Sequence, residues 1–516
     1  MDNELPALTI FPSSLSHVVA IDASTGHIHV EKRLSGDPVL LTWLDRNRRN
    51  GHQLTLIPTE VDEISRLRNT GLRLEKHLDI TLEVKNEAIA IIRTASQYGA
   101  SDLHLMMRGT HTEIQVVVDG HLFTLRKLSQ KEGESLALAI YQGLATTKDA
   151  SFNPLEFQNA QISGEDLPVD VAVTSLRIVR GPCYPQAKNG SFMTLRLQYA
   201  RHHRQLDMPA LPYPKGPEGE LQLRHMGYSP RQVEKLKMLM DAPSGLVVFT
   251  GPTGSGKTTA MHEALQELAR TKPYRRLVTA EDPVEYPMDW AVQIPITNAK
   301  TNIETAAAFA ATARVMLRMA PNTIQLGELR DAEVAVTALE MAVTGHQVWT
   351  TLHVDDPYLI VERLEFMDTI KLNRRVFCDH KIVRGVVAQR LLPKLCPHCS
   401  VPMKAKSSHV SERMVLALRS WGDVDKVRVQ SAHGCALCGG RGTAGRFAVA
   451  EVVVACASLM TDFIEHGSEI ARRNHRKLPD SDASMLETAI QYALDGVVDP
   501  RSIEDKVDLI KVRNDQ

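Results

Sequence analysis

Apolar and polar positions in residues 81–204 predict one helix followed by several strands. The apolar residues of 87–98 recur with helical spacing, Asn86 is a candidate N-cap, and Gly99 can end the helix. Alternating apolar runs follow, and two of them are joined by an Asp-Gly turn that is typical of a hairpin. The predicted strands are residues 101–107, 112–118, 121–128, 169–179 and 191–198.

A segment rich in proline and glycine follows this α+β pattern. Residues 205–219 hold four prolines and two glycines, which predicts a stiff linker. Ser229, Pro230 and Gln232 then have the residue types of an N-cap, an N1 proline and a capping-box partner. From there to about position 395, strand and helix patterns alternate, as in a parallel α/β sheet.

The first 80 residues have a weaker pattern and no motif that indicates chemistry. Short β-like runs stand at 8–11, 17–21 and 53–57, next to a charged helical stretch. The chain is thus predicted to have an N-terminal docking domain, an α+β domain, a linker and an α/β domain with C-terminal helices. Their predicted boundaries are 1–80, 81–204, 205–228 and 229–516.

Charge and hydropathy narrow the class of protein. The 60 Lys and Arg residues nearly cancel the 61 Asp and Glu residues, so the chain lacks the basic field that binds a phosphate backbone. A nucleic-acid motor is therefore disfavoured. No run of about 18 apolar residues occurs, and acids stand near the start where a secretory signal has Lys or Arg. We expect a cytoplasmic protein whose role at a membrane is peripheral.

Residues 244–259 carry the pattern of a phosphate-binding loop. A short apolar strand precedes a glycine-rich turn, and a helical pattern follows it, so a chance glycine turn is a poor explanation. Glycines let backbone N–H groups wrap around the triphosphate of ATP, while Lys257 reaches its β- and γ-phosphates and Thr258 ligates Mg²⁺. The predicted ATP-binding residues are Gly251, Pro252, Thr253, Gly254, Ser255, Gly256, Lys257, Thr258 and Thr259.

Acidic residues stand at the ends of two later apolar strands. Glu281 and Asp282 follow one strand directly, and Glu328 follows another. In a parallel α/β sheet the carboxyl ends of the strands face the nucleotide, where carboxylates can polarise the attacking water and orient Mg²⁺. Such an acid can also simply cap the next helix, which is the role expected for Asp331. Glu281 and Glu328 are predicted to be catalytic.

Two histidines, His346 and His353, flank the apolar run QVWTTL. An isolated histidine is more often a structural residue than a catalyst, so spacing alone singles out neither.

Four of the seven cysteines form two C-x-x-C pairs that are 35 residues apart. Four thiolates suit the tetrahedral coordination of Zn²⁺ and leave no open position for a catalytic water. We expect a structural zinc in a subdomain at 396–446, with reduced cysteines in a zinc-free loop as the alternative. The predicted ligands are Cys396, Cys399, Cys435 and Cys438, and the other thiols, Cys183, Cys378 and Cys456, are expected to be inert.

Taken in order, these motifs resemble the ATPases of type II secretion and type IV pilus assembly. The matching pieces are the phosphate loop, TAEDPVEY, GELRD, TGHQVWTTLH, and CPHC with CALCGGRGTAGR. The resemblance covers about residues 85–515. The four cysteines are typical of the assembly and secretion branch of the family and are generally missing from the retraction branch.

The resemblance implies a RecA-like P-loop domain preceded by a PAS-like α+β domain. It also implies that Glu281 is the general base, Glu328 the Walker B acid and His353 a γ-phosphate sensor. Family members form hexamers in which the α+β domain closes over the nucleotide and lends arginines, for which Arg196 is the candidate here. Rotation of that domain would drive assembly of a type IV pilus or a type II pseudopilus through a platform protein of the bacterial inner membrane.

Two alternatives stay open at this point. One is a conjugative traffic ATPase or nucleic-acid motor built on the same core, although no nucleic-acid partner is expected. The other is a nucleotide-binding switch with negligible hydrolysis, because RMAPN at 318–322 replaces the family's RQDPD and the strand at 112–118 lacks the usual arginines.

Overall fold

The computed structural model divides the chain into two compact units, Met1–Thr81 and Leu82–Gln516. The described residues are 19–22, 26–49, 52–60, 63–64, 82–200, 205–296, 302–404 and 410–513.

The first unit contains a small sheet with strand order β1-β2-β3 and one described long helix, α1. Leu40, Trp43 and Leu44 of α1 pack against Ile28 and Val30 of β2, which gives the unit its own apolar core. The β-like run at 8–11 lies outside the described residues. The elements are β1 Val19–Asp22, β2 His27–Glu31, α1 Pro38–Arg49 and β3 Thr55–Thr59.

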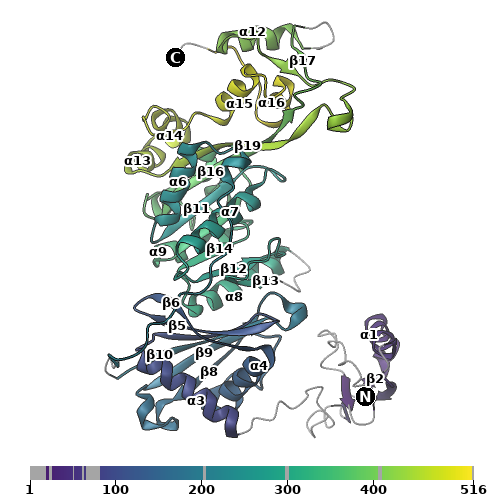
Figure 1. Cartoon of the computed structure of the whole chain (residues 1–516), viewed down its shortest axis with the longest axis vertical. Coiled ribbons are helices and arrows are strands. Elements are labelled where there is room, and N and C mark those ends of the chain that lie inside the picture. Colours follow the sequence, from purple (N-terminus) through teal and green to yellow (C-terminus); the bar gives the residue numbers. More distant parts are fainter. Residues whose placement is uncertain are drawn as a thin grey trace. The chain divides into compact units, whose positions relative to one another are not determined.

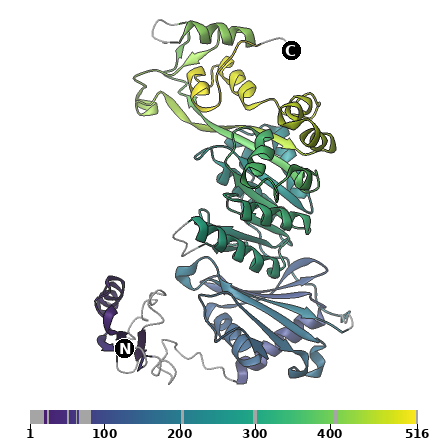
Figure 2. The same ribbon diagram turned by 180° about the vertical axis from the view of Figure 1, so that it is seen from behind.

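The second unit begins with a seven-stranded antiparallel sheet in the order β6-β5-β4-β10-β9-β8-β7. Helices α3 and α4 cover one face of it, and the strands are seen from the other side in Figure 2. The elements are α3 Leu82–Gln97, β4 Asp102–Met107, β5 His111–Val118, β6 His121–Ser129, α4 Gln130–Leu138, β7 Thr147–Lys148, β8 Gln158–Ser163, β9 Ser175–Pro182 and β10 Ser191–Gln198.

Three details of this part differ from the sequence prediction. Helix α3 begins at Leu82, so Asn86 lies inside the helix and is not its cap. The predicted strand at 169–179 starts only at Ser175, because residues 169–171 form a 3₁₀ turn and Ala172 has a φ of 56°. Strand β8 was missed, since its sequence QNAQIS has no apolar alternation.

The linker has no helix or strand from Gln205 to Gln222, as predicted. Short helix α5, Leu223–Met226, then precedes α6, Pro230–Asp241. The Ser229 side chain accepts from the Gln232 backbone N–H and the Gln232 side chain accepts from Ser229 N, which confirms the capping box.

A second seven-stranded sheet forms the centre of the unit (Figure 1), in the order β13-β12-β14-β15-β11-β16-β19. Its first six strands are parallel, and β19 pairs antiparallel with β16. The mixed α/β fold with a parallel sheet is thus confirmed. The strands are β11 Gly245–Thr250, β12 Leu277–Glu281, β13 Ala291–Pro295, β14 Thr323–Leu326, β15 Gln347–Leu352, β16 Val383–Leu395 and β19 Thr443–Val454.

Helices cover both faces of this sheet. Leu246 and Val248 of β11 point to the face covered by α8, α9, α10 and α13, whereas Val247 and Phe249 point to the face covered by α6 and α7. Burial on both faces explains why these strands are continuously apolar. The other helices around this sheet are α7 Lys257–Thr271, α8 Asn302–Met316, α9 Ala332–Val343, α10 Ile360–Met367, α11 Arg374–Phe377 and α13 Ala457–Glu465.

Strands β16 and β19 continue beyond the sheet as a two-stranded ribbon, which carries a small C-terminal subdomain. Its core is formed by Leu392 and Val449 of the ribbon with residues of α12, α15 and α16. The remaining elements are β17 Val401–Pro402, α12 Glu412–Trp421, β18 Arg428–Val429, α14 Gly467–His475, α15 Met485–Leu494 and α16 Pro500–Lys506.

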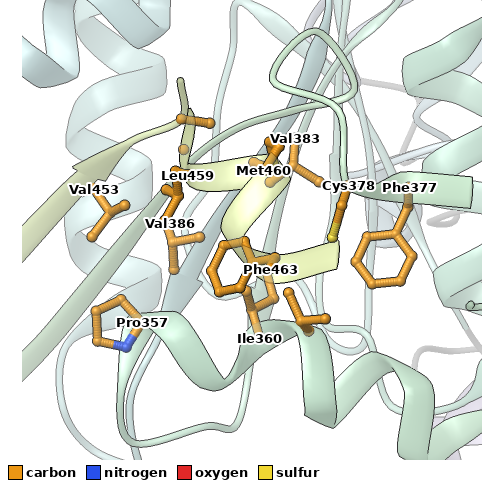
Figure 3. Close-up of a pocket in the computed structure, with 13 residues that line it drawn as sticks. Pro357, Ile360, Phe377, Cys378, Val383, Val386, Val453, Leu459, Met460 and Phe463 are labelled. Atoms are coloured by element: carbon orange, nitrogen blue, oxygen red, sulfur yellow. The ribbon is translucent and has the colours of Figure 1, made fainter. Parts of the chain in front are cut away.

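A small cavity lies between α10, α11, α13, the start of β16 and the end of β19 (Figure 3). Only apolar side chains and one thiol line it, among them Ile360, Phe377, Cys378, Val386 and Phe463. It therefore offers no groups for catalysis. In the part of the chain that the structure describes, no helix is long and apolar enough to cross a bilayer.

Candidate active site

The phosphate loop joins the end of β11 to the start of α7. Gly254 and Gly256 have φ angles of 76° and 84°, which glycine adopts without strain. A side chain at Gly251 would come within 2.5 Å of the Gln389 carbonyl oxygen. The Ser255 hydroxyl is buried and has no hydrogen-bond partner among the described residues. The close backbone turn, the helix start and the unpartnered hydroxyl all fit a bound phosphate group.

Lys257 lies within this loop. Its Nζ donates to the carbonyl oxygens of Gly251 and Pro252, both at 2.9 Å. Burial lowers the pKa of Lys257, and the nearby charge of Glu328 opposes that shift. The ammonium is thus held inside the loop and close to an acid at the end of β14.

Glu328 lies where the ends of three neighbouring strands meet. His353, which follows β15, has its Nε2 3.2 Å from Glu328 Oε1. Arg330 donates from Nε to Glu328 Oε2 at 2.9 Å and from Nη1 to Asp282, which follows β12, at 3.1 Å. The structure therefore brings together two of the predicted catalytic residues, Glu328 and His353, next to the phosphate loop.

Glu281 is the last residue of β12, and it is only 4% exposed. Its Oε1 accepts from Thr279 Oγ1 at 2.5 Å and from Gln293 Nε2 at 2.9 Å. Burial raises the pKa of the Glu281 carboxyl, whereas these two hydrogen bonds lower it. A buried carboxylate with a raised pKa can act as a general base near neutral pH.

Several residues around the loop carried no recognisable signal in the sequence. Gln389 donates from Nε2 to the Ser255 carbonyl at 2.6 Å and accepts from the Tyr228 hydroxyl. Arg390 is buried and is ion-paired with Asp355 at 3.0 Å. Both β16 residues reach the loop because β16 pairs with β11, and that long-range pairing is not visible in a local pattern.

The candidate arginines lie on two strands of the first sheet. Arg196 of β10 is half exposed and pairs with Asp102 at 3.0 Å, and Arg177 lies opposite it on β9. Arg180, on β9, is buried: its guanidinium lies 4.0 Å from the Phe152 ring centre and donates to Gln158. Burial lowers the pKa of Arg180 to about 10, which fits a structural role.

The four predicted zinc ligands converge at the far end of the ribbon. All four Sγ atoms lie within 4.8 Å of one another, and three of the pairs are 3.8 to 3.9 Å apart. Zinc–thiolate bonds of about 2.3 Å in a tetrahedron place sulfurs about 3.8 Å apart, so the cluster fits Zn²⁺. Cys435 is 39 residues from Cys396 in sequence, and the ribbon brings the two pairs together.

Comparison with known proteins agrees with this geometry. The family model for Type II/IV secretion system proteins matches residues 215–505, more than half of the chain. The type IV pilus assembly ATPase PilB of Thermus thermophilus is 28% identical over 418 residues, which cover 79% of this chain and 41% of that protein.

Two further relatives match over more of their own length. The type II secretion system protein E of Pseudomonas aeruginosa is 29% identical over 79% of this chain and 72% of its own. The type II secretion system ATPase E of Vibrio cholerae is 28% identical over 75% of this chain and 68% of its own. The chain spans less than half of the Thermus relative. It belongs to the family of type II/IV secretion system proteins, whose matched members include named ATPases.

Proposed function

We propose that the protein hydrolyses ATP and uses the energy as a motor for assembling a type IV pilus or a type II pseudopilus. The observation that carries the proposal is the convergence of Lys257, Glu328 and His353 around a glycine-rich loop, with Glu281 on the neighbouring strand β12. The family membership and the names of the relatives support the choice of machine.

Each residue has a distinct part in the proposed reaction. Backbone N–H groups of the loop and the Lys257 ammonium bind the β- and γ-phosphates, and Thr258 would hold Mg²⁺, which neutralises developing charge on these phosphates. Glu281 accepts a proton from the attacking water. Glu328 and His353, whose side chains contact each other at 3.2 Å, are the residues that would act at the γ-phosphate.

The proposed motor is a homo-hexamer on the cytoplasmic face of the inner membrane, in contact with a platform protein. The linker of residues 205–222, which has no helix or strand, is the segment about which the α+β domain would turn. Arg196 is the proposed arginine that reaches a neighbouring active site, since it is half exposed on β10.

Replacement of the loop lysine tests this proposal. In Lys257→Ala we expect Mg²⁺-dependent release of phosphate from ATP to fall by about 10²-fold or more, because a positive charge at the transferred phosphoryl group is lost. The matched control is Lys237→Ala, since Lys237 is a half-exposed lysine on α6 that pairs with Glu234. Equal rates for Lys257→Ala and wild type would refute the assignment of the site.

A further inference from the structure

Strand β13 is the edge strand of the central sheet, and residues of the α+β domain bond to its backbone. Tyr184, which follows β9, donates its backbone N–H to the Gln293 carbonyl at 2.8 Å. Arg108, which follows β4, donates from Nη1 to the Ala291 carbonyl. The α+β domain thus binds directly to the backbone of β13.

The same contact has an apolar core and a buried cation. Met106, Val179, Cys183 and Phe192 of the α+β domain belong to one buried cluster with residues of β12, β13 and α8. Arg276 is 3% exposed between the two parts, with its guanidinium beside Gln115 and Met106. The contact of the α+β domain with β13, its seat on that strand, is therefore a packed interface. It includes apolar contacts and a buried cation in addition to the two hydrogen bonds.

The side chain of Gln293 points the other way, toward the active site. It is 2% exposed, and its Nε2 donates to Glu281 Oε1 and to the Tyr286 carbonyl, each at 2.9 Å. Its Oε1 accepts from the Met288 backbone N–H at 2.7 Å. One residue thus contacts the α+β domain through its backbone and the candidate general base through its side chain.

We propose that Gln293 is a positioning residue for ATP hydrolysis, which orients the Glu281 carboxylate and ties that orientation to the seating of the α+β domain on β13. The proposal rests on the function proposed above, because Glu281 acts as a base only if the site hydrolyses ATP. Both side-chain donors, from Thr279 and Gln293, meet the same oxygen, and this fixes the direction of the other carboxylate oxygen.

The step itself is hydrolysis of the terminal phosphoanhydride. The oxygen of water forms a bond to the γ-phosphorus while the bond from that phosphorus to the ADP oxygen breaks. The proton of the water passes to the Glu281 carboxylate and from there to solvent, so the products are ADP and phosphate. Gln293 exchanges no atom in this step and acts only through the direction and basicity of Glu281.

The groups around Glu281 determine the expected pH dependence. Burial raises the pKa of the Glu281 carboxyl, and the neighbouring charge of Glu285 raises it further. Hydrogen bonds from the Thr279 and Gln293 side chains and from the Glu285 backbone lower it. Asp282, the next residue, is paired with Arg330. Loss of the Gln293 donor therefore raises the pKa of the base, which must be ionised to work.

The main experiment compares kcat, KM and the pH profile of kcat/KM for the full chain with ATP and Mg²⁺. In Gln293→Leu we expect kcat to fall by about tenfold with KM changed by less than about twofold, because the base is misplaced while the phosphate loop is intact. We expect the acidic limb of the profile to move up by roughly one pH unit. An unchanged profile with wild-type kcat would overturn the proposal.

Control variants separate positioning from general damage. Gln347→Leu removes a buried glutamine of β15 whose Nε2 donates to the carbonyls of Leu239 and Ala242 instead, so it should leave the profile in place. Thr279→Val should move the profile in the same direction as Gln293→Leu, and Thr279→Ser should restore it. These threonine variants keep the proposal testable if Gln293→Leu does not fold.

A double-mutant cycle tests the link to the α+β domain. Arg108→Met weakens the seat on β13, and its effect on kcat should not add to that of Gln293→Leu if both act through Glu281. Fully additive losses would overturn the link. Wild-type hydrolysis that is retained in Glu281→Gln would refute the function of Glu281, whereas loss in Glu281→Gln with normal Gln293→Leu would refute only the role of Gln293.

Discussion

At the scale of single residues, Glu451 is a buried acid outside the active site, and it is paired with Arg476. Glu451 is 1% exposed on β19, and Arg476 donates to both of its oxygens at 2.8 and 2.9 Å. Arg476 also stacks on Tyr358, at 5.2 Å from the ring centre. Burial raises the pKa of the Glu451 carboxyl to about 7, whereas Arg476 favours its ionised form.

Removal of one partner of this pair should be far more damaging than removal of both. In Arg476→Met we expect the free energy of unfolding to fall by about 3 kcal/mol, because the buried Glu451 carboxyl loses its counter-ion and has to take up a proton. The combined variant Glu451→Gln with Arg476→Met should recover most of the loss. Denaturant unfolding measures both, with Arg473→Met, an exposed arginine on α14, as the control. A larger loss in the combined variant than in Arg476→Met would contradict this account.

At the scale of helices and strands, the predictions that rest on short capping motifs are confirmed. Ser229 caps α6, Asp331 caps α9 by accepting from Val334 N, and Gly99 ends α3 with a φ of 69°. The start of α3 and the strand predicted at 169–179 were wrong, because an apolar spacing does not show where the backbone turns.

In the active site, too, the residues that belong to short motifs could be predicted from the sequence, whereas the contacts made through strand pairing could not. The glycine loop and the acids at strand ends were visible because each is a short motif. The contact of Gln293 with Glu281 depends on the pairing of β12 with β13, and that of Gln389 with Ser255 depends on the pairing of β11 with β16 across 134 residues, so no single motif indicates either contact.

The cysteine cluster at the end of the ribbon of β16 and β19 leads to a prediction about the zinc content of the protein. Protein purified without chelator should contain about one equivalent of zinc per chain, and Cys396→Ser should lose it. Hydrogen exchange should then increase in residues 396–446, because four thiolates no longer hold the two pairs together, while β11 stays protected. Cys456→Ser, which lies outside the cluster, is the control. Absence of metal from the wild-type protein would exclude the zinc site.

At the scale of the whole molecule, the division after Thr81 predicts that the second unit folds by itself. The first unit packs its own core around Ile28, Leu40 and Trp43, and the α+β domain and the α/β domain share a separate buried cluster. We expect residues 82–516 to keep Mg²⁺-dependent ATP binding and to unfold within about 4 °C of the full chain. Circular dichroism and calorimetry measure this, and a fragment without a cooperative transition would contradict it.

The contact of the α+β domain with β13 also affects the risk of aggregation while the chain is being synthesised. An uncovered outer strand offers unpaired backbone groups to any other chain and so invites aggregation. Residues 82–200 leave the ribosome before β13 does, and domains generally fold in that order. The α+β domain, which covers β13, is therefore already synthesised when β13 emerges. The order of the α+β and α/β domains along the chain thus protects the nascent protein from aggregation.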